Sequence, residues 1–113
     1  MKLVDKGITM EEVRQMSQRM FGGLVKGVVD IEKQIMVLDA DMHADEENYL
    51  LELGSFQDNL WGINLYPDIP GDDFLEFDSM INVRPRLKNF TRSIENADLQ
   101  KKIIAIVHKL IIK

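Results

Sequence analysis

LWGINLYPDIPGDDFLEFDSMINVRP, residues 60–85, contains two runs in which apolar and polar residues alternate. The apolar positions are Trp61, Ile63 and Leu65 in the first run, then Leu75, Phe77, Ile81 and Val83 in the second. A period of two is typical of a strand with one buried face. The segment between them, PDIPGDD, is rich in turn residues and has the length of a hairpin loop. The pattern therefore predicts two antiparallel strands.

A second hairpin is predicted upstream, within residues 25–42. Val25, Val29 and Ile31 share one face, and apolar residues alternate again from Met36 to Met42 beyond a turn near Glu32 and Lys33. This turn has no Asn-Gly or Asp-Gly pair. One long bent strand, or a helix through part of the segment, is therefore an open alternative.

Three helices complete the predicted order. Thr9 with Glu12 forms a capping box before a helix over about 10–21, and Gly22-Gly23 supplies the stop. A short helix over about 44–53 has its acids in the first turn, and Asn96 is the N-cap of a last helix with one apolar stripe. The order α-β-β-α-β-β-α predicts a single α+β domain, 1–113, with an antiparallel sheet of about four strands and helices on one face.

Composition limits the class of protein. The 113 residues are 45% hydrophobic and include no cysteine, which excludes disulfides and thiolate chemistry and fits a reducing compartment. No apolar stretch has signal-peptide or membrane-span length, so we expect a soluble cytoplasmic protein. Lys and Arg number 6 against 17 Asp and Glu in residues 1–83, but 8 against 2 in residues 84–113. Over the whole chain the acidic residues outnumber the basic ones, which argues against nucleic acid as a partner.

DADMHADEE, residues 39–47, suggests a metal site but does not fit the known patterns. A calcium loop that starts at Asp39 would need glycine at Ala44 and glutamate at Leu50. A zinc HExxH motif needs two histidines one turn apart, and the second histidine, His108, lies in the predicted last helix. No metal site is predicted from these patterns, and the sequence does not specify a cofactor.

His43 is the main candidate for acid/base chemistry. If the preceding strand runs to Met42, His43 points toward the face where the other hairpin places further polar groups. Asp45 and Asp78 are its candidate partners, and the polar groups of that face include Asn64, Tyr66, Asn82 and Arg84. The alternative is a solvated sheet face, with His43 as a capping or hydrogen-bonding residue at a strand-to-helix junction.

NVRPRLKNFTRS, residues 82–93, is a candidate anion site. Arginine forks suit carboxylate or phosphate, and a loop that leads to a helix N-terminus adds backbone donors. The candidate contacts in residues 84–92 are Arg84, Arg86, Lys88, Asn89 and Arg92. The alternative is a solvated basic connection that offsets the acidic body. No glycine-rich phosphate loop of the GxxxxGK[ST] or GxGxxG type occurs.

Three stretches carry a resemblance: HADEE at 43–47, LWGINLYP at 60–67 and EFDSMINVRP at 76–85. With them the chain resembles an uncharacterised prokaryotic domain-of-unknown-function family with HADxE, LWGxNxYP and EFDSMINxRP stretches, over roughly residues 25–112. The resemblance implies a common fold and no reaction. The family's pattern falls on His43, Asp45, Glu47, Gln57, Trp61, Asn64, Tyr66, Asp78, Ser79, Asn82, Arg84, Asn89 and Arg92. After Arg84 the chain departs from that pattern, so a shared anion site is better placed at Arg84 and Arg92 than at Arg86 and Lys88.

Two hypotheses follow. The first is a non-enzymatic binding or interaction protein, with self-association as an option, that recognises a small anion or a protein. Its ligand residues are Asn64, Tyr66, Asn82, Arg84, Asn89 and Arg92. The second is a small enzyme in which His43 acts with Asp45 or Asp78 as acid/base or as metal ligands. Ile104 and Ile112 lie outside the apolar stripe of the last helix, and they either face a second subunit or widen the buried face.

Overall fold

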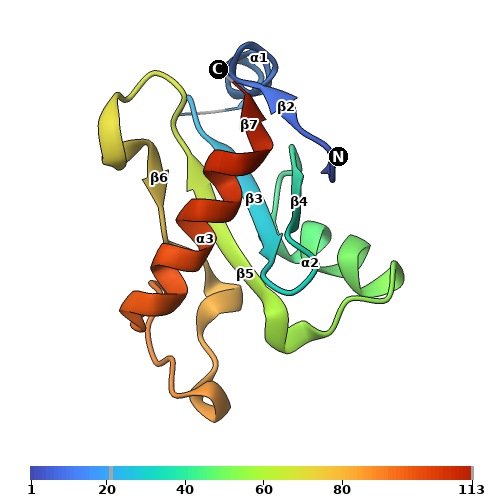
Figure 1. Cartoon of the computed structure of the whole chain (residues 1–113), viewed down its shortest axis with the longest axis vertical. Helices are drawn as coiled ribbons and strands as arrows, with labels where there is room; N and C mark the ends of the chain where they lie inside the picture. Colours follow the sequence, from blue (N-terminus) through green and yellow to red (C-terminus); the bar gives the residue numbers. More distant parts are fainter. Residues whose placement is uncertain (21, 113) are drawn as a thin grey trace.

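The computed structural model describes residues 1–20 and 22–112. A five-stranded sheet forms its centre, with neighbouring strands antiparallel throughout (Figure 1). In spatial order the strands are β1 (Lys2–Val4), β4 (Ile35–Leu38), β3 (Val25–Asp30), β5 (Leu60–Leu65) and β6 (Leu75–Glu76). The predicted α+β class, the antiparallel sheet and both hairpins are confirmed. The extra strand is β1, whose three residues are too few to show a period.

Helices cover both faces of the sheet. On one face α1 (Met10–Gln18) and α3 (Ala97–Leu110) pack against the core that contains Val29, Trp61 and Ile63, and Figure 1 shows α3 crossing this face. On the other face α2 (His43–Glu52) places Leu50 against a separate cluster of Val28, Val37 and Leu60. The prediction that all helices share one face does not hold for α2. The inner strands carry apolar residues on both faces, so both faces need a cover.

The turn between β3 and β4 is organised by Asp30. This buried carboxylate accepts hydrogen bonds from the backbone N–H groups of Glu32 and Lys33, each at 2.9 Å, and from the hydroxyl of Ser55 at 2.6 Å. Gln34 closes the turn with φ of 57°. An Asx-type turn therefore replaces the Asn-Gly pair that a tight hairpin prefers.

The strand predicted from the alternation of Leu75, Phe77, Ile81 and Val83 is much shorter in the structure. Only Leu75 and Glu76 pair with β5, and the chain then forms two short 3-10 helices, η3 (Met80–Asn82) and η4 (Pro85–Leu87). Ser79 packs directly over Gly62, where an added Cβ would lie 2.6 Å from the Cβ of Ser79. The chain thus passes over the face of β5 at Gly62 instead of running beside it.

Both ends of the chain are tied together by a small parallel pair, β2 (Ile8–Thr9) with β7 (Ile111–Ile112). The predicted caps are confirmed: Thr9 accepts from the N–H of Glu12 at 3.1 Å, and Asn96 accepts from the N–H of Leu99 at 3.0 Å. Helix α1 ends at Gln18, earlier than predicted, and Phe21 lies outside the described residues. The remaining 3-10 helices are η1 (Gln57–Asn59) and η2 (Gly71–Phe74).

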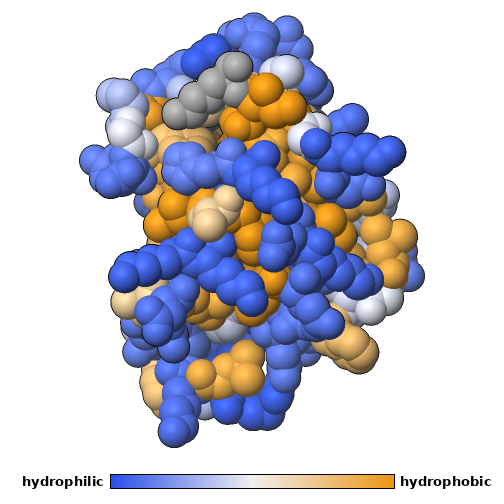
Figure 2. Space-filling model, in the orientation of Figure 1, coloured by the Kyte–Doolittle hydropathy of each residue, from blue (hydrophilic) through white to orange (hydrophobic). Residues whose placement is uncertain are grey.

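The surface on the α3 side is mainly hydrophilic, with apolar side chains visible between the charged ones (Figure 2). Among the described helices none is both long and apolar enough to cross a bilayer.

Candidate functional site

Three of the predicted site residues, His43, Arg84 and Arg92, line hollows at the contact between α2 and η3. Two hollows flank η3 and share Met80 and Ile81. The first, the His43 hollow, has a volume of about 200 Å³ and is lined further by Lys26, Met42, His43, Ala44, Ser79 and Arg92. The second, the Arg84 hollow, has a volume of about 340 Å³ and is lined further by Glu47, Gln57, Val83, Arg84, Pro85 and Arg86. His43 and Glu47 are one turn apart on α2, so the same helix face supplies both hollows.

His43 is the first residue of α2 and is half-buried. Its Nε2 lies 2.9 Å from the carbonyl oxygen of Ile63. Because a carbonyl only accepts, Nε2 carries the proton and Nδ1 is the acceptor. Burial lowers the pKa of His43 below its ordinary value, and the hydrogen bond to Ile63 acts in the opposite direction. The imidazole is therefore neutral at neutral pH and has one basic nitrogen.

Of the two predicted partners of His43, Asp78 is the one whose charge affects the pKa of His43. Its carboxylate accepts from Nε of Arg92 at 2.7 Å, and Arg92 lines the His43 hollow. Its negative charge also raises the pKa of His43, although less than burial lowers it. Asp45 lies elsewhere, in a depression with Asn48 and Tyr49, because residues two apart on a helix do not share a face.

Asn64 and Tyr66 belong to a hydrogen-bond network beside Asp78. Oε1 of Glu76 accepts from Nδ2 of Asn64 at 2.9 Å and from the hydroxyl of Tyr66 at 3.0 Å. Nδ2 of Asn64 also donates to the carbonyl of Asp78 at 3.1 Å. Burial, together with Glu76, raises the pKa of Tyr66. The network holds the start of the segment that crosses over β5.

Arg84 forms the wall of the second hollow. Its side chain is only 10% exposed, and Nη2 donates to Oε2 of Glu47 at 2.9 Å. The guanidinium carbon lies 4.9 Å from the centre of the Trp61 ring, within cation-π range. Burial lowers the pKa of Arg84, and the charge of Glu47 acts in the opposite direction. Nη1 is buried and has no acceptor within residues 1–20 and 22–112.

The 84–92 loop uses many of its own donors inside the chain. Arg86 is paired with Asp58, and Arg92 with Asp78. The backbone N–H groups of Phe90 and Thr91 donate to the carboxylate of Glu95. The anion that the loop amides bind is therefore a side chain of the protein itself.

The amide side chains predicted as ligand groups are also engaged internally. Nδ2 of Asn89 donates to the carbonyls of Asn82 and Ser93, each at 2.7 Å, and Oδ1 accepts from the N–H of Glu95 at 2.9 Å. Asn82 is fully buried and bonds the backbone of Gly62. A ligand role for either amide stays a prediction, and it would require these bonds to break.

Sequence reasoning missed two features of α2. One is the pairing of Glu47 with Arg84, although the HADxE and INxRP stretches each contributed one partner to the resemblance. The other is Glu46, which is completely buried and accepts from the N–H of Ala40 at 3.2 Å. Burial raises the pKa of Glu46 to about 9, so this carboxyl is protonated at neutral pH. A charge pattern alone would have placed it on the surface.

The described part of the chain contains no group of three or more His, Asp or Glu arranged to hold a metal ion. Searches of curated proteins and of solved structures found no match. The family DUF5674, described as a protein of unknown function, matches residues 2–110. The predicted resemblance to a family of unknown function is therefore confirmed, and the match begins nearer the N-terminus than the quoted stretches. The chain belongs to the DUF5674 family.

Proposed function

We propose that this domain is a non-enzymatic binding protein whose Arg84 hollow takes a small anion, a carboxylate in the first instance. One observation carries the proposal: Nη1 of Arg84 is a buried charged donor that has no acceptor in residues 1–20 and 22–112. Buried donors are paired in the great majority of proteins, and an unpaired one costs about 1–3 kcal/mol. An oxygen atom of a ligand or an ordered water would satisfy it.

The surroundings of Arg84 support a carboxylate. Nη1 has two N–H donors on a fixed plane, and bonds from a guanidinium to an anion are stronger than neutral ones. Gln57 and Arg86 add polar groups to the lining. Met80 is 65% exposed and Val83 36% exposed at the same hollow, so a short aliphatic portion would find apolar contacts.

The test is a titration with acetate, propionate and phosphate at constant ionic strength. Thermal shift and NMR of the arginine Nε–H groups are the readouts. We expect propionate to stabilise the wild type by mass action and to shift the Arg84 resonance. Arg84→Lys keeps the charge but loses the fork, so it should abolish the effect, whereas Arg19→Lys, at an exposed arginine that lines neither hollow, is the matched control and should retain it.

A second variant separates binding from folding. Glu47→Gln removes the competing carboxylate and leaves Arg84 in place, so anions should bind more tightly to it than to the wild type. The proposal fails if no anion perturbs Arg84 in the wild type, or if Arg19→Lys and Arg84→Lys lose the effect equally.

The alternative is a small enzyme that uses His43, and a specific feature favours it. The bond from Nε2 to Ile63 fixes the ring and leaves Nδ1 as its basic nitrogen, and His43 lines a hollow that also contains Arg92. Hydrolysis of p-nitrophenyl acetate is a simple probe of such a base. A rate above that of free imidazole that falls in both His43→Gln and Asp78→Asn would favour the enzyme. A rate unchanged by His43→Gln would exclude this role.

A cytoplasmic location and self-association belong to the same proposal. The absence of cysteine supports a reducing compartment. Exposed apolar side chains support association, because Phe56 is 71% exposed and Phe90 62% exposed. Sedimentation velocity over a range of concentrations measures the oligomeric state directly, and a single monomeric species throughout would contradict self-association.

A further inference from the structure

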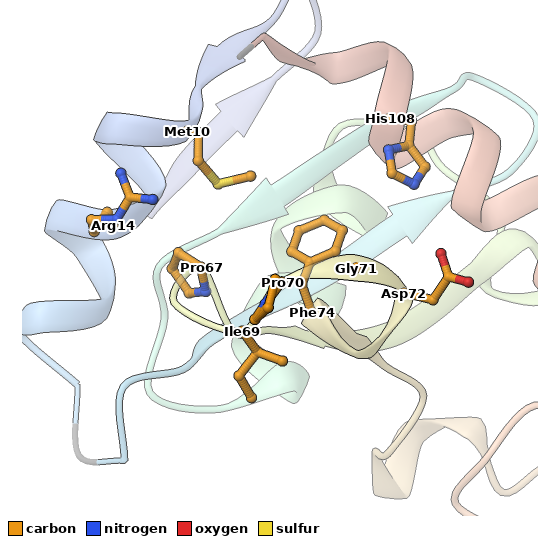
Figure 3. Close-up of a pocket in the computed structure, with 9 residues that line it drawn as sticks. All are labelled: Met10, Arg14, Pro67, Ile69, Pro70, Gly71, Asp72, Phe74 and His108. Atoms are coloured by element: carbon orange, nitrogen blue, oxygen red, sulfur yellow. The ribbon is translucent and has the colours of Figure 1, made fainter.

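A third cavity lies away from the α2–η3 contact, on the side of the sheet covered by α1 and α3. It has a volume of about 290 Å³ and is formed by the start of α1, the connection from β5 to β6, and α3. These three segments are far apart in the sequence and meet only through the fold (Figure 3). None of the residues predicted as site residues lines this cavity.

The lining is mostly apolar and partly preformed. Figure 3 shows Met10, Pro67, Ile69 and Pro70 around the ring of Phe74, which is only 7% exposed. Two of the three prolines of the chain are in this wall. Because proline fixes φ, the wall loses little conformational freedom when a ligand binds.

The lining has one cationic and one anionic side chain, those of Arg14 and Asp72. Arg14 already donates to Glu11 at 3.3 Å and to Asp68 at 3.2 Å. Asp72 also lines the cavity, and its carboxylate has no hydrogen bond or ion pair within the described residues. Arg14 is thus already paired with two carboxylates, those of Glu11 and Asp68, whereas Asp72 has no such partner within the described residues. A cation, rather than an anion, complements this lining.

The unpaired carboxylate of Asp72 and the ring of Phe74 belong to the same short helix, η2, and both line the cavity. In Figure 3, Asp72 and His108 are on one side of Phe74 and Arg14 is on the other. The rings of His108 and Phe74 have centroids 6.0 Å apart and are tilted by 51°. A cation at this end would meet a carboxylate and the face of an aromatic ring, which both attract positive charge.

We propose that this cavity binds a small primary amine with a single aromatic or branched aliphatic group. The ammonium contacts Asp72 and the face of Phe74, and the hydrocarbon lies against Met10 and the two prolines. The volume is at the lower end of the range for small-molecule sites, about 300 Å³, so the ligand has one ring and not several. The site is independent of the anion site proposed at Arg84.

The experiment compares benzylamine with benzoate and benzyl alcohol, which have the same ring and a different charge. Amide and side-chain NMR shifts of the full chain report binding. We expect benzylamine to shift the signals of Phe74, Met10 and His108 with millimolar affinity, and benzoate to bind at least about fivefold more weakly.

Two neighbouring aspartates provide a matched pair of variants. Asp72 and Asp73 are both exposed residues of η2, but only Asp72 lines the cavity. Asp72→Asn should weaken benzylamine binding by about fivefold or more, and Asp73→Asn by less than about twofold, since the latter acts only through long-range charge. Ile69→Ala removes apolar lining and should weaken all three compounds. The proposal is overturned if benzoate binds as tightly as benzylamine, if both aspartate variants have equal effects, or if the signals of the cavity do not shift.

Discussion

Asn82 bonds both backbone groups of Gly62, so its side chain takes the place of a strand neighbour at the middle of β5. Oδ1 accepts from the N–H of Gly62 at 2.8 Å, and Nδ2 donates to its carbonyl at 3.0 Å. Nδ2 also donates to the carbonyl of Arg92 at 3.0 Å. One buried amide therefore joins η3, the central sheet and the end of the 84–92 loop.

The first prediction concerns this amide. Asn82→Ala leaves a buried N–H and carbonyl of Gly62 without partners, so we expect the free energy of unfolding to fall by about 2–5 kcal/mol. Urea unfolding followed by circular dichroism measures the change. Asn48→Ala, at an exposed position of α2, is the control and should change stability by less than about 1 kcal/mol. If Asn82→Ala keeps wild-type stability but loses ligand binding, Asn82 is a ligand group and the structural role is wrong.

The sequence predicted those helices and strands that a local pattern, such as an alternation or a helix cap, is sufficient to specify. The alternation from Trp61 to Leu65 predicted β5, and Thr9 and Asn96 predicted the helix starts. The same alternation continued beyond Glu76, yet the strand stopped there. What stops it is the contact of Ser79 with Gly62, which depends on residues far apart in the sequence. A period of two describes an alternating chain, and it does not identify the neighbour that the chain will pair with.

The sequence predicted several residues that line the site, but it did not predict which of them contact one another. His43 and Arg92 do line one hollow, and Arg84 does lie in a wall. However, Arg84 faces Glu47 and Trp61, and the loop amides face Glu95. Opposite charges in one chain tend to satisfy one another first. The charge pattern could not show which cations the fold would neutralise, because those pairs form between distant segments.

The second prediction concerns Asp30, whose buried carboxylate accepts three hydrogen bonds in the β3–β4 turn. Bonds to a charged group contribute about 1.5–3 kcal/mol each, and they are not additive, so Asp30→Ala should destabilise the fold by about 3–4 kcal/mol. Ser55→Ala removes one of them and should cost about half as much or less. Chemical denaturation of both variants tests the order. A larger loss in Ser55→Ala than in Asp30→Ala would contradict this account of the turn.

The third prediction follows from Glu46. Its pKa is raised to about 9 in the folded chain, against 4.5 in the unfolded one, so between these values the folded state holds one proton more. The contribution of Glu46 to stability is fully present below the unfolded pKa and falls with rising pH by up to about 1.4 kcal/mol per pH unit. Glu46→Gln is neutral at every pH and should lack this slope.

The test is to measure the free energy of unfolding of the wild type and of Glu46→Gln at several pH values between 5 and about 9. The two proteins should be most similar at the acidic end, and the variant should be relatively more stable at the alkaline end. Parallel curves would mean that Glu46 ionises at an ordinary pKa, and hence that the α2 interior admits water.

The fourth prediction concerns the protonation of His43. Burial lowers its pKa below 6.5, so between the folded and unfolded values the unfolded state binds more protons. The stability that His43 contributes is therefore present above the unfolded pKa and is lost as the pH falls through the folded pKa.

NMR of the imidazole nitrogens should show the Nε2–H tautomer at neutral pH and a titration midpoint below that of the urea-unfolded protein. His43→Gln should remove the destabilisation on acidification, because an amide does not titrate there. A midpoint at or above the unfolded value would mean that the hydrogen bond to Ile63, together with the charge of Asp78, outweighs burial, and that His43 is charged at a higher pH than its burial implies.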